Sequence, residues 1–285
     1  GDAMVKVVEA FNASQDRIHV RYFVTSDIGQ KSIVAIAGGD PPDVIGLYAF
    51  NVPPDAESRA LIPLNDLAPK FGVTLEQYAP GVRQVMQHRT PAGNWWATVN
   101  TAGSVALYYN LALFREVGLD PDRPPRTIAE LDDAHRRLVK VKGTGAKSTL
   151  ERVGFLHREP GWWSWLWAYH FGGRIYDPAS DRALVDSPEN IRALEWMQGY
   201  ARDLGVDRVK TFAEGFGSYF TPENAFLTGK VAMIVQGPWI ANLVQAFKPD
   251  LDYGVAAFPT ASDVAQPTSD PPPTGLIDTD GCALG

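Results

Sequence analysis

The residues best suited to chemistry in this sequence are aromatic. The stretch Gly161–Gly173, GWWSWLWAYHFGG, holds four of the eight tryptophans of the chain. Flat rings of this kind stack on a ligand that has a flat apolar face, fill a core, or lie in a membrane interface. The run is too short to span a bilayer and has no basic polar face, so a membrane role is the weakest reading. A core and a ligand site remain as alternatives.

Helical spacing divides the rings between these alternatives. If the stretch is a helix, Trp163, Trp167 and Phe171 share one face, and Trp165 lies on another together with Tyr169. A helix that is apolar all round is buried. We therefore predict that Trp165, Trp167 and Phe171 pack in the core.

The start of the same stretch is the better candidate for ligand contact. Trp162 and Trp163 follow a turn that contains Pro160 and Gly161, and we predict that they reach a ligand. His170, inside the stretch, is predicted to be a core residue whose hydrogen bonds are satisfied.

Signals for an enzyme or a metal protein are poor. The sequence has no zinc-protease, nucleophile-elbow or phosphate-loop motif. The five histidines show no ligand-pair spacing, and the single cysteine, Cys282, excludes a cysteine-based zinc cluster. We expect no catalytic residue, no metal and no cofactor. A carboxylate pair such as Glu159 and Glu214 could still serve a glycosidase, and that alternative stays open.

The elements that must position these residues alternate along the chain. Apolar spacing and capping signals predict helices over 2–13, 28–37, 111–117, 127–141 and 188–204, from Thr221, and after Gly237-Pro238. Period-2 or continuous apolar runs predict strands over 18–24, 43–47, 96–99, 105–109, 153–156, 231–235 and 253–257. This alternation indicates an α/β fold with a parallel sheet.

Ligands of open α/β sheets bind beyond the carboxyl ends of the strands, which selects the candidate binding residues. Trp239 follows one predicted strand at the start of a helix, with its backbone fixed by Gly237 and Pro238. The candidates that follow other predicted strands are Tyr48, Asn51, Asn100, Thr101, Trp162 and Trp163.

Length and charge set further bounds. The chain has 285 residues and a net charge of −7, which fits about two domains and argues against a nucleic-acid partner. It shows no signal peptide, no first strand before the opening helix, and a Pro-rich loop over 259–274. We expect a fold that is incomplete at both ends.

Five segments form a recognisable series that runs in order along nearly the whole chain: Ala35–Val44 (AIAGGDPPDV), Ala106–Leu119 (ALYYNLALFREVGL), Thr127–Leu131 (TIAEL), Phe226–Met233 (FLTGKVAM) and Gly237–Trp239 (GPW). Together they resemble the extracellular solute-binding proteins of bacterial carbohydrate ABC importers, the family that includes maltose-binding protein.

The resemblance implies a type II periplasmic-binding-protein fold with two lobes. It suggests an N-terminal lobe over 1–108, a C-terminal lobe over 109–258, and a linker over 259–285 that returns to the first lobe. It implies that a sugar binds between the lobes, that Trp239 stacks on it, and that Tyr48, Asn51, Asn100 and Thr101 lie on cleft loops of the first lobe. Trp162 and Trp163 would form the wall of the second lobe.

The expected function is capture of a carbohydrate, in particular an oligosaccharide, by a monomeric receptor that is not an enzyme. Its partners would be the membrane permease subunits of an ABC importer, and its location periplasmic or extracellular, with a lipoprotein anchor as one option. The alternatives are a non-sugar ligand (a phosphorylated polyol, a peptide or a polyamine) and, less favoured, a glycosidase or lyase. A phosphate ligand would need basic residues on the cleft loops, where the sequence offers only Arg158.

Overall fold

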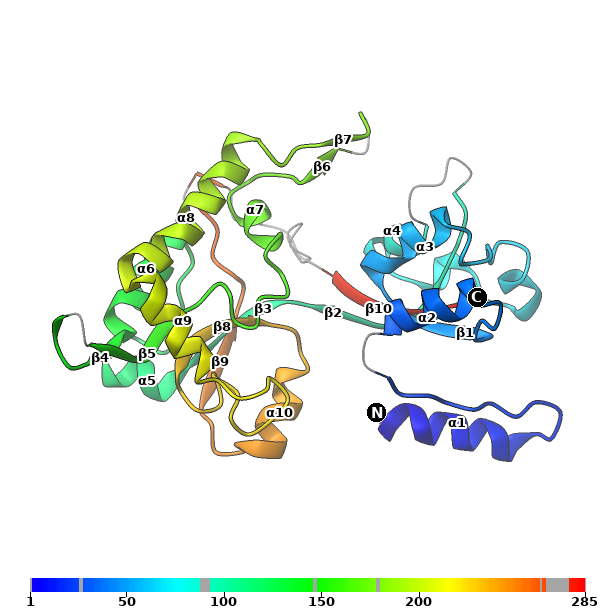
Figure 1. Ribbon diagram of the computed structural model, residues 1–285, viewed down its shortest axis with the longest axis horizontal. Coiled ribbons are helices and arrows are strands. Elements are labelled where there is room, and N and C mark those ends of the chain that lie inside the picture. The colour runs from blue at the N-terminus through cyan, green and yellow to red at the C-terminus, as the bar shows by residue number, and fades with distance from the viewer. Residues whose placement is uncertain are drawn as a thin grey trace. The chain divides into compact units, whose positions relative to one another are not determined.

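The computed structural model describes residues 2–25, 28–87, 93–145, 148–177, 180–261, 263–264 and 277–284. The chain divides into two compact units (Figure 1). Unit 1 comprises Gly1–Ala102 and Asp278–Gly285, and unit 2 comprises Gly103–Ile277. No helix in the described part of the chain has the length and apolar character needed to cross a bilayer.

Unit 1 combines four helices with a three-stranded sheet, within the described residues. The helices are α1 (Asp2–Ser14), α2 (Ile28–Ala37), α3 (Val52–Glu57) and α4 (Pro80–Met86). The strands are β1 (Val44–Tyr48), β2 (Thr98–Ser104, which runs on into unit 2) and β10 (Ile277–Leu284), in the order β1-β10-β2. Its small core is built on Ile45, Leu47, Val52, Leu61 and Ala97.

The segment 18–24, predicted as a strand, forms none. The Asn12 side chain of α1 instead accepts a hydrogen bond from the Val20 backbone N–H (2.8 Å) and donates one to the Val20 carbonyl (2.9 Å). Ile18, Tyr22 and Val24 are exposed. Apolar alternation creates a strand only when another strand lies alongside to complete the backbone ladder, and no described strand pairs with this segment.

Unit 2 is built around a five-stranded sheet in the order β4-β5-β8-β3-β9. Its strands are β3 (Ala106–Asn110), β4 (Lys140–Lys142), β5 (Thr149–Phe155), β8 (Val231–Gln236) and β9 (Tyr253–Ala256), with a separate hairpin of β6 (Tyr176–Asp177) and β7 (Arg182–Ala183). Its helices are α5 (Leu111–Glu116), α6 (Ile128–Leu138), α7 (Leu166–His170), α8 (Pro188–Leu204), α9 (Val206–Glu214) and α10 (Ile240–Phe247).

The sheet of unit 2 is mixed, so the prediction of a parallel sheet is wrong. Its β5–β8 pair is parallel, while β4 runs antiparallel to β5 and β3 runs antiparallel to both β8 and β9. In unit 1, β1 pairs antiparallel with β10. Helix–strand alternation along the chain gives the element order, but the direction of a strand depends on partners that are distant in sequence.

Both faces of the unit 2 sheet are covered. Alternate residues of β3 enter different cores: Leu107 and Tyr109 pack with α6, α7 and α8, whereas Tyr108 packs with residues of α9 and α10. Every residue of β8 is buried, as its continuous apolar run predicts. The strand β8 is covered on both faces and has a neighbouring strand on each side. It therefore holds the segment after Gln236 in a fixed position.

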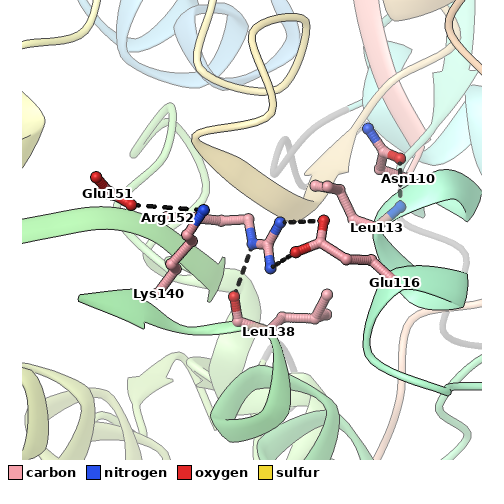
Figure 2. Close-up of polar contacts among 7 residues, drawn as sticks. All are labelled: Asn110, Leu113, Glu116, Leu138, Lys140, Glu151 and Arg152. Atoms are coloured by element: carbon pink, nitrogen blue, oxygen red, sulfur yellow. Dashed lines mark hydrogen bonds and ion pairs between the residues drawn. The ribbon is translucent and has the colours of Figure 1, made fainter. Parts of the chain in front are cut away.

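A buried arginine joins three elements of unit 2 (Figure 2). The Arg152 guanidinium of β5 donates to both carboxylate oxygens of Glu116 in α5 (2.8 and 3.0 Å) and to the Leu138 carbonyl at the end of α6 (2.8 Å). At the other end of α5, the Asn110 side chain accepts from the Leu113 N–H (3.0 Å) and caps the helix. These bonds fix how α5 and α6 lie against the sheet.

The core of unit 2 also contains three buried histidines, His135, His157 and His170. His135 accepts a hydrogen bond from the Phe155 backbone N–H (3.0 Å). His170 packs on the Phe258 ring (4.4 Å between centroids), and neither of its ring nitrogens has a partner among the described residues. His170 is therefore a core residue as predicted, but its hydrogen bonds are not satisfied. Burial lowers the pKa of each of the three imidazoles to about 4.

These histidines should make unit 2 sensitive to acid. Their folded-state pKa of about 4 lies below the ordinary 6.5, so the unfolded chain takes up protons first as the pH falls from 6.5 to 4. Each histidine then contributes a loss of about 1.4 kcal/mol of stability per pH unit in that window, and none above it. In urea unfolding followed by tryptophan fluorescence, His170→Leu should show a shallower loss of stability between pH 6.5 and 4.5, and the wild-type slope at pH 7–8. An identical slope across the acid window would contradict this account.

Candidate functional site

The tryptophans predicted to follow two neighbouring strands come together in unit 2. Since β5 and β8 are parallel, their carboxyl ends lie at the same edge of the sheet. Trp162 and Trp163 follow β5, and Trp239 follows β8. The Trp163 and Trp239 rings lie 5.9 Å apart between centroids, and Trp162 meets Trp163 edge to face at 5.6 Å.

Two further rings, Tyr219 and Phe220, join this group from the loop before β8. Tyr219 lies 4.6 Å from Trp162 edge to face, and Phe220 stacks on Trp162 at 6.1 Å with an interplanar angle of 26°. We name Trp162, Trp163, Tyr219, Phe220 and Trp239 the aromatic cluster. Trp162 and Phe220 are exposed, Trp163 is buried, and Tyr219 and Trp239 are half-buried. The cluster therefore presents open ring faces that rest on a packed base.

Local backbone chemistry explains how the first two rings are placed. Gly161 has a φ of +86°, and a side chain there would press on the Arg158 carbonyl at 2.9 Å. Glycine is therefore required for the tight turn that redirects the chain after β5. The Glu159 N–H bonds to the Leu156 carbonyl (2.9 Å) within the same turn, which carries Trp162 and Trp163 to the sheet edge.

The loop that carries Tyr219 is held by Asn224, which is buried. Its side chain accepts from the backbone N–H groups of Phe226 and Leu227 (2.9 and 3.3 Å) and donates to the Tyr219 carbonyl (2.9 Å). A helix was predicted to begin at Thr221, and this is wrong, because the segment forms successive turns before β8. The Asn224 side chain occupies the backbone groups that a helix would use.

Helical spacing misplaces Trp165. The helix α7 has only five residues and Trp162–Trp165 precede it in turns, so the assumed helical faces do not apply. Trp167 and Phe171 lie in the core as predicted, whereas Trp165 is 43% exposed and packs edge to face on Tyr169. The prediction of a core position for Trp165 is wrong.

Gly237 allows the Trp239 ring to fold back on the backbone. A methyl group at Gly237 would overlap the six-membered ring of Trp239. The Trp239 indole N–H donates to the Gln236 side-chain oxygen (3.1 Å), which locks the ring orientation. The close approach of ring and backbone explains why glycine precedes Pro238 here.

Polar groups without partners lie at the same place. The Gln236 side chain is fully buried, and its amide nitrogen has no hydrogen-bond partner among the described residues. The Tyr219 hydroxyl is also buried and has no hydrogen bond of good geometry there; burial is the main cause that raises its pKa, the neighbouring Trp239 side chain lowers it, and Glu159 raises it further. A buried group left unpaired costs about 1–3 kcal/mol, so such groups at a site edge are suited to meet hydroxyls of a ligand.

Glu159 adds a carboxyl group beside the cluster. It is half-buried in the turn before Trp162, and burial raises its pKa to about 7. Glu214, its companion in the glycosidase alternative, is an exposed residue that ends α9. Sequence reasoning missed Glu159, Tyr219 and Gln236 as binding candidates. Glu159 and Gln236 follow or end predicted strands, a signal that could have found them, whereas Tyr219 lies on a loop that only the fold places here.

The candidates of unit 1 lie in two places that are separated by β10 in the sheet. Tyr48 ends β1, is exposed, and stacks on the exposed Phe50 at 5.4 Å with an interplanar angle of 13°. Asn51 closes a short 3₁₀ turn (Ala49–Asn51), and its amide lies close to Gly29 of α2. Phe50 was missed, although it lies between two predicted candidates.

Asn100 and Thr101 were predicted to lie on a loop after a strand, and this placement is wrong. The strand β2 runs from Thr98 to Ser104, so both residues lie within it, and both are exposed. The sequence pattern ends too early because the polar run Asn100–Ser104 hides a strand that pairs through its backbone with β10.

No group of three or more potential metal-ligating side chains gathers in the described part of the chain. The aromatic cluster combines open ring faces with buried polar groups that lack partners among the described residues and with one carboxyl nearby. Such a combination fits a ligand with an apolar face and a rim of hydroxyls.

Comparison with known proteins defines the class. Residues 1–275 match the family model described as bacterial extracellular solute-binding protein, and the chain belongs to this family. Its fold is the two-lobe, type II fold: the solved structure of CpMnBP1 with mannobiose bound is similar to the whole chain, with a TM-score of 0.81, 24% identity and 70% of that structure covered.

Curated relatives include both sugar and phosphate binders. The maltotriose-binding protein of Pyrococcus abyssi is 22% identical over 254 residues, which cover 89% of this chain and 49% of the relative. The sn-glycerol-3-phosphate-binding periplasmic protein UgpB of Rhizobium meliloti is 30% identical over 267 residues, covering 89% of this chain and 58% of the relative. The chain thus spans about half the length of the curated relatives it matches.

The close contact at Gly237 can be tested directly. Gly237→Ala should push the Trp239 indole away from Gln236 and lower the unfolding free energy by about 1–3 kcal/mol, the range for overpacking. The change should appear as an altered near-ultraviolet circular dichroism spectrum and a shifted tryptophan emission. Gly199→Ala in α8 is the control, since its new methyl group would come no nearer than 3.8 Å to another group and should stabilise the helix by about 0.5–1 kcal/mol. Unchanged spectra for Gly237→Ala would show that the ring does not lie on the glycine.

Proposed function

We propose that this protein is a receptor that captures a carbohydrate, in particular an oligosaccharide, for import by an ABC transporter, and that it is not an enzyme. The observation that carries the proposal is the aromatic cluster, which lies next to buried polar groups that have no partner. A pyranose has an apolar C–H face that rings cover and hydroxyls that the Gln236 amide and the Tyr219 hydroxyl would pair. The matches to a maltotriose-binding protein and to mannobiose-bound CpMnBP1 support the same ligand class.

The two units would act as the two lobes, as the predicted division into 1–108, 109–258 and a returning segment 259–285 suggests. The ligand would contact Trp239, Trp162 and Gly237 of unit 2, and the buried Trp163 would support the other two rings, against which it packs. Tyr48, Asn51, Asn100 and Thr101 would contribute from unit 1, where Tyr48 and Phe50 form a second stacking surface. A ligand that contacts both lobes binds the closed state more tightly than the open state. It favours closure by the difference between these two binding free energies.

The partners and location follow from the same reading. The receptor would act as a monomer in the periplasm or outside the cell, free or held by a lipid anchor, and would deliver its ligand to membrane permease subunits. The family description as bacterial extracellular and the periplasmic relatives support this location.

A phosphorylated polyol is the second candidate ligand, and the UgpB relatives favour it. The aromatic cluster itself argues against it, because none of its five residues is an arginine or a lysine, the side chains that hold a phosphate. The basic residue nearest in sequence to Trp162 is Arg158, which is exposed and is followed directly by the Glu159 carboxyl.

The test is a titration of tryptophan fluorescence and calorimetry with mono- and oligosaccharides and with glycerol 3-phosphate. Six of the eight tryptophans lie in unit 2, so the signal reports mainly on that unit. Trp239→Ala should weaken binding of the responding sugar by about 2 kcal/mol, roughly 30-fold. Trp165→Ala is the matched control, since Trp165 is exposed on Tyr169 outside the cluster, and should leave the affinity unchanged.

Recovery of the sugar separates a receptor from an enzyme. Chromatography of the ligand after prolonged incubation should return it intact, whereas shortened products would support the glycosidase alternative. Saturable binding of glycerol 3-phosphate in place of any sugar would replace the proposed ligand class. An equal loss of affinity in Trp239→Ala and Trp165→Ala would move the site away from the cluster.

A further inference from the structure

Gly103 lies where the chain passes from unit 1 into unit 2, inside the strand β2. Glycine weakens a strand, and inside one it often marks a place where another group approaches closely. The φ of Gly103 lies outside the left-handed region, so the backbone conformation does not require glycine there. The surrounding space does: a methyl group on Gly103 would lie 3.2 Å from Cδ and 3.4 Å from Cγ of Pro238.

The strand register explains why Gly103 meets Pro238. In the antiparallel β3–β8 pair, Ala106 lies opposite Gln236. Continuing this register by three residues along each chain brings Gly103 to the level of Trp239, and so beside Pro238. Gly103 and Pro238 both belong to unit 2, so the contact is set by the sheet of that unit.

The turn after β8 carries this contact to the Trp239 ring. The Ala241 N–H bonds to the Pro238 carbonyl (3.2 Å), which ties Pro238 to the first turn of α10. The Trp239 ring lies against Gly237, and its indole N–H donates to the Gln236 side chain (3.1 Å). Because the ring is already in close contact on this side, a displacement of Pro238 has to move it.

We propose that Gly103 is a positioning residue of the sugar site: because it has no side chain, the strand that joins the two units can lie against Pro238, and this contact keeps the Trp239 ring in place for stacking. The inference rests on the proposed function and deepens it, because it connects the ring that would stack on the sugar with the strand through which unit 1 continues into unit 2. A larger residue in place of Gly103 would press on Pro238, tilt the ring and weaken sugar binding.

The experiment is a double-variant cycle, read by calorimetry with maltotriose and mannobiose and by near-ultraviolet circular dichroism without a ligand. Gly103→Ala should weaken sugar binding by about fivefold or more, the scale of overpacking by one methyl group, and should alter the tryptophan signal of the ligand-free protein. Pro238→Ala removes both ring atoms that the new methyl group would meet. The double variant should therefore bind sugar more tightly than Gly103→Ala alone and recover most of the wild-type spectrum.

Gly199→Ala in α8 is the control, because its methyl group would come no nearer than 3.8 Å to another group, and it should leave affinity and spectrum unchanged. Urea unfolding of each variant separates a loss of the fold from a displaced ring. Wild-type affinity in Gly103→Ala, or losses from the two single variants that simply add, would overturn the role of Gly103 and leave the receptor function standing. A wild-type protein that binds neither sugar would overturn both.

Discussion

The structure depends on one constraint, that a hydrogen-bonding group taken out of water has to find a partner. Arg152 shows the constraint fulfilled: its guanidinium is buried, yet it bonds both oxygens of Glu116 and the Leu138 carbonyl (Figure 2). A buried charge without such partners would be strongly unfavourable. Because the bonds reach α5 and α6 from β5, satisfying one side chain also fixes two helices on the sheet. Asn224 does the same for the loop that carries Tyr219.

The same constraint is unfulfilled at the end of β8, as it also is at His170 in the core of unit 2. Gln236 is fully buried, and only its oxygen is paired, by the Trp239 indole. A leucine would fill the space without the cost of an unpaired amide. A polar side chain kept in such a position is explained if a ligand completes its hydrogen bonds. The rigid strand beneath it keeps the amide and the Trp239 ring in a fixed relation, so little conformational entropy is lost when a ligand binds.

The parts of the fold that could be predicted are those set by neighbours in sequence. A capping serine and a proline at the first helical position predict the start of helices such as α8. In the structure the Ser187 hydroxyl accepts a hydrogen bond from the Asn190 N–H (3.3 Å), as expected for a helix cap. The continuous apolar run over 231–235 likewise predicts the buried strand β8. Strand direction, the missing strand at 18–24 and the turns after Thr221 could not be predicted. Each depends on partners that are distant in sequence or on a side chain that competes with the backbone.

The candidate site shows the same division. That rings follow β5 and β8 is visible in the sequence, because strand ends can be located and tryptophans are rare. The sequence does not show which rings are exposed to solvent. Trp163 is buried, whereas Trp165 is exposed although helical spacing predicts that it is buried. The polar residues of the candidate site are even harder to predict from the sequence than the exposed rings. Nothing in the sequence says that the Gln236 amide lacks a partner, since this is a property of the packed structure.

The aromatic and polar halves of the site support each other physically. Rings alone would bind any flat apolar compound, and the exposed Trp162–Phe220 stack would then be a liability in water. Unpaired polar groups alone would be met by water at little cost. In the proposed site they would together penalise a ligand that cannot both cover the rings and pair the buried polar groups. Discrimination of this kind comes from groups left unpaired by the wrong ligand.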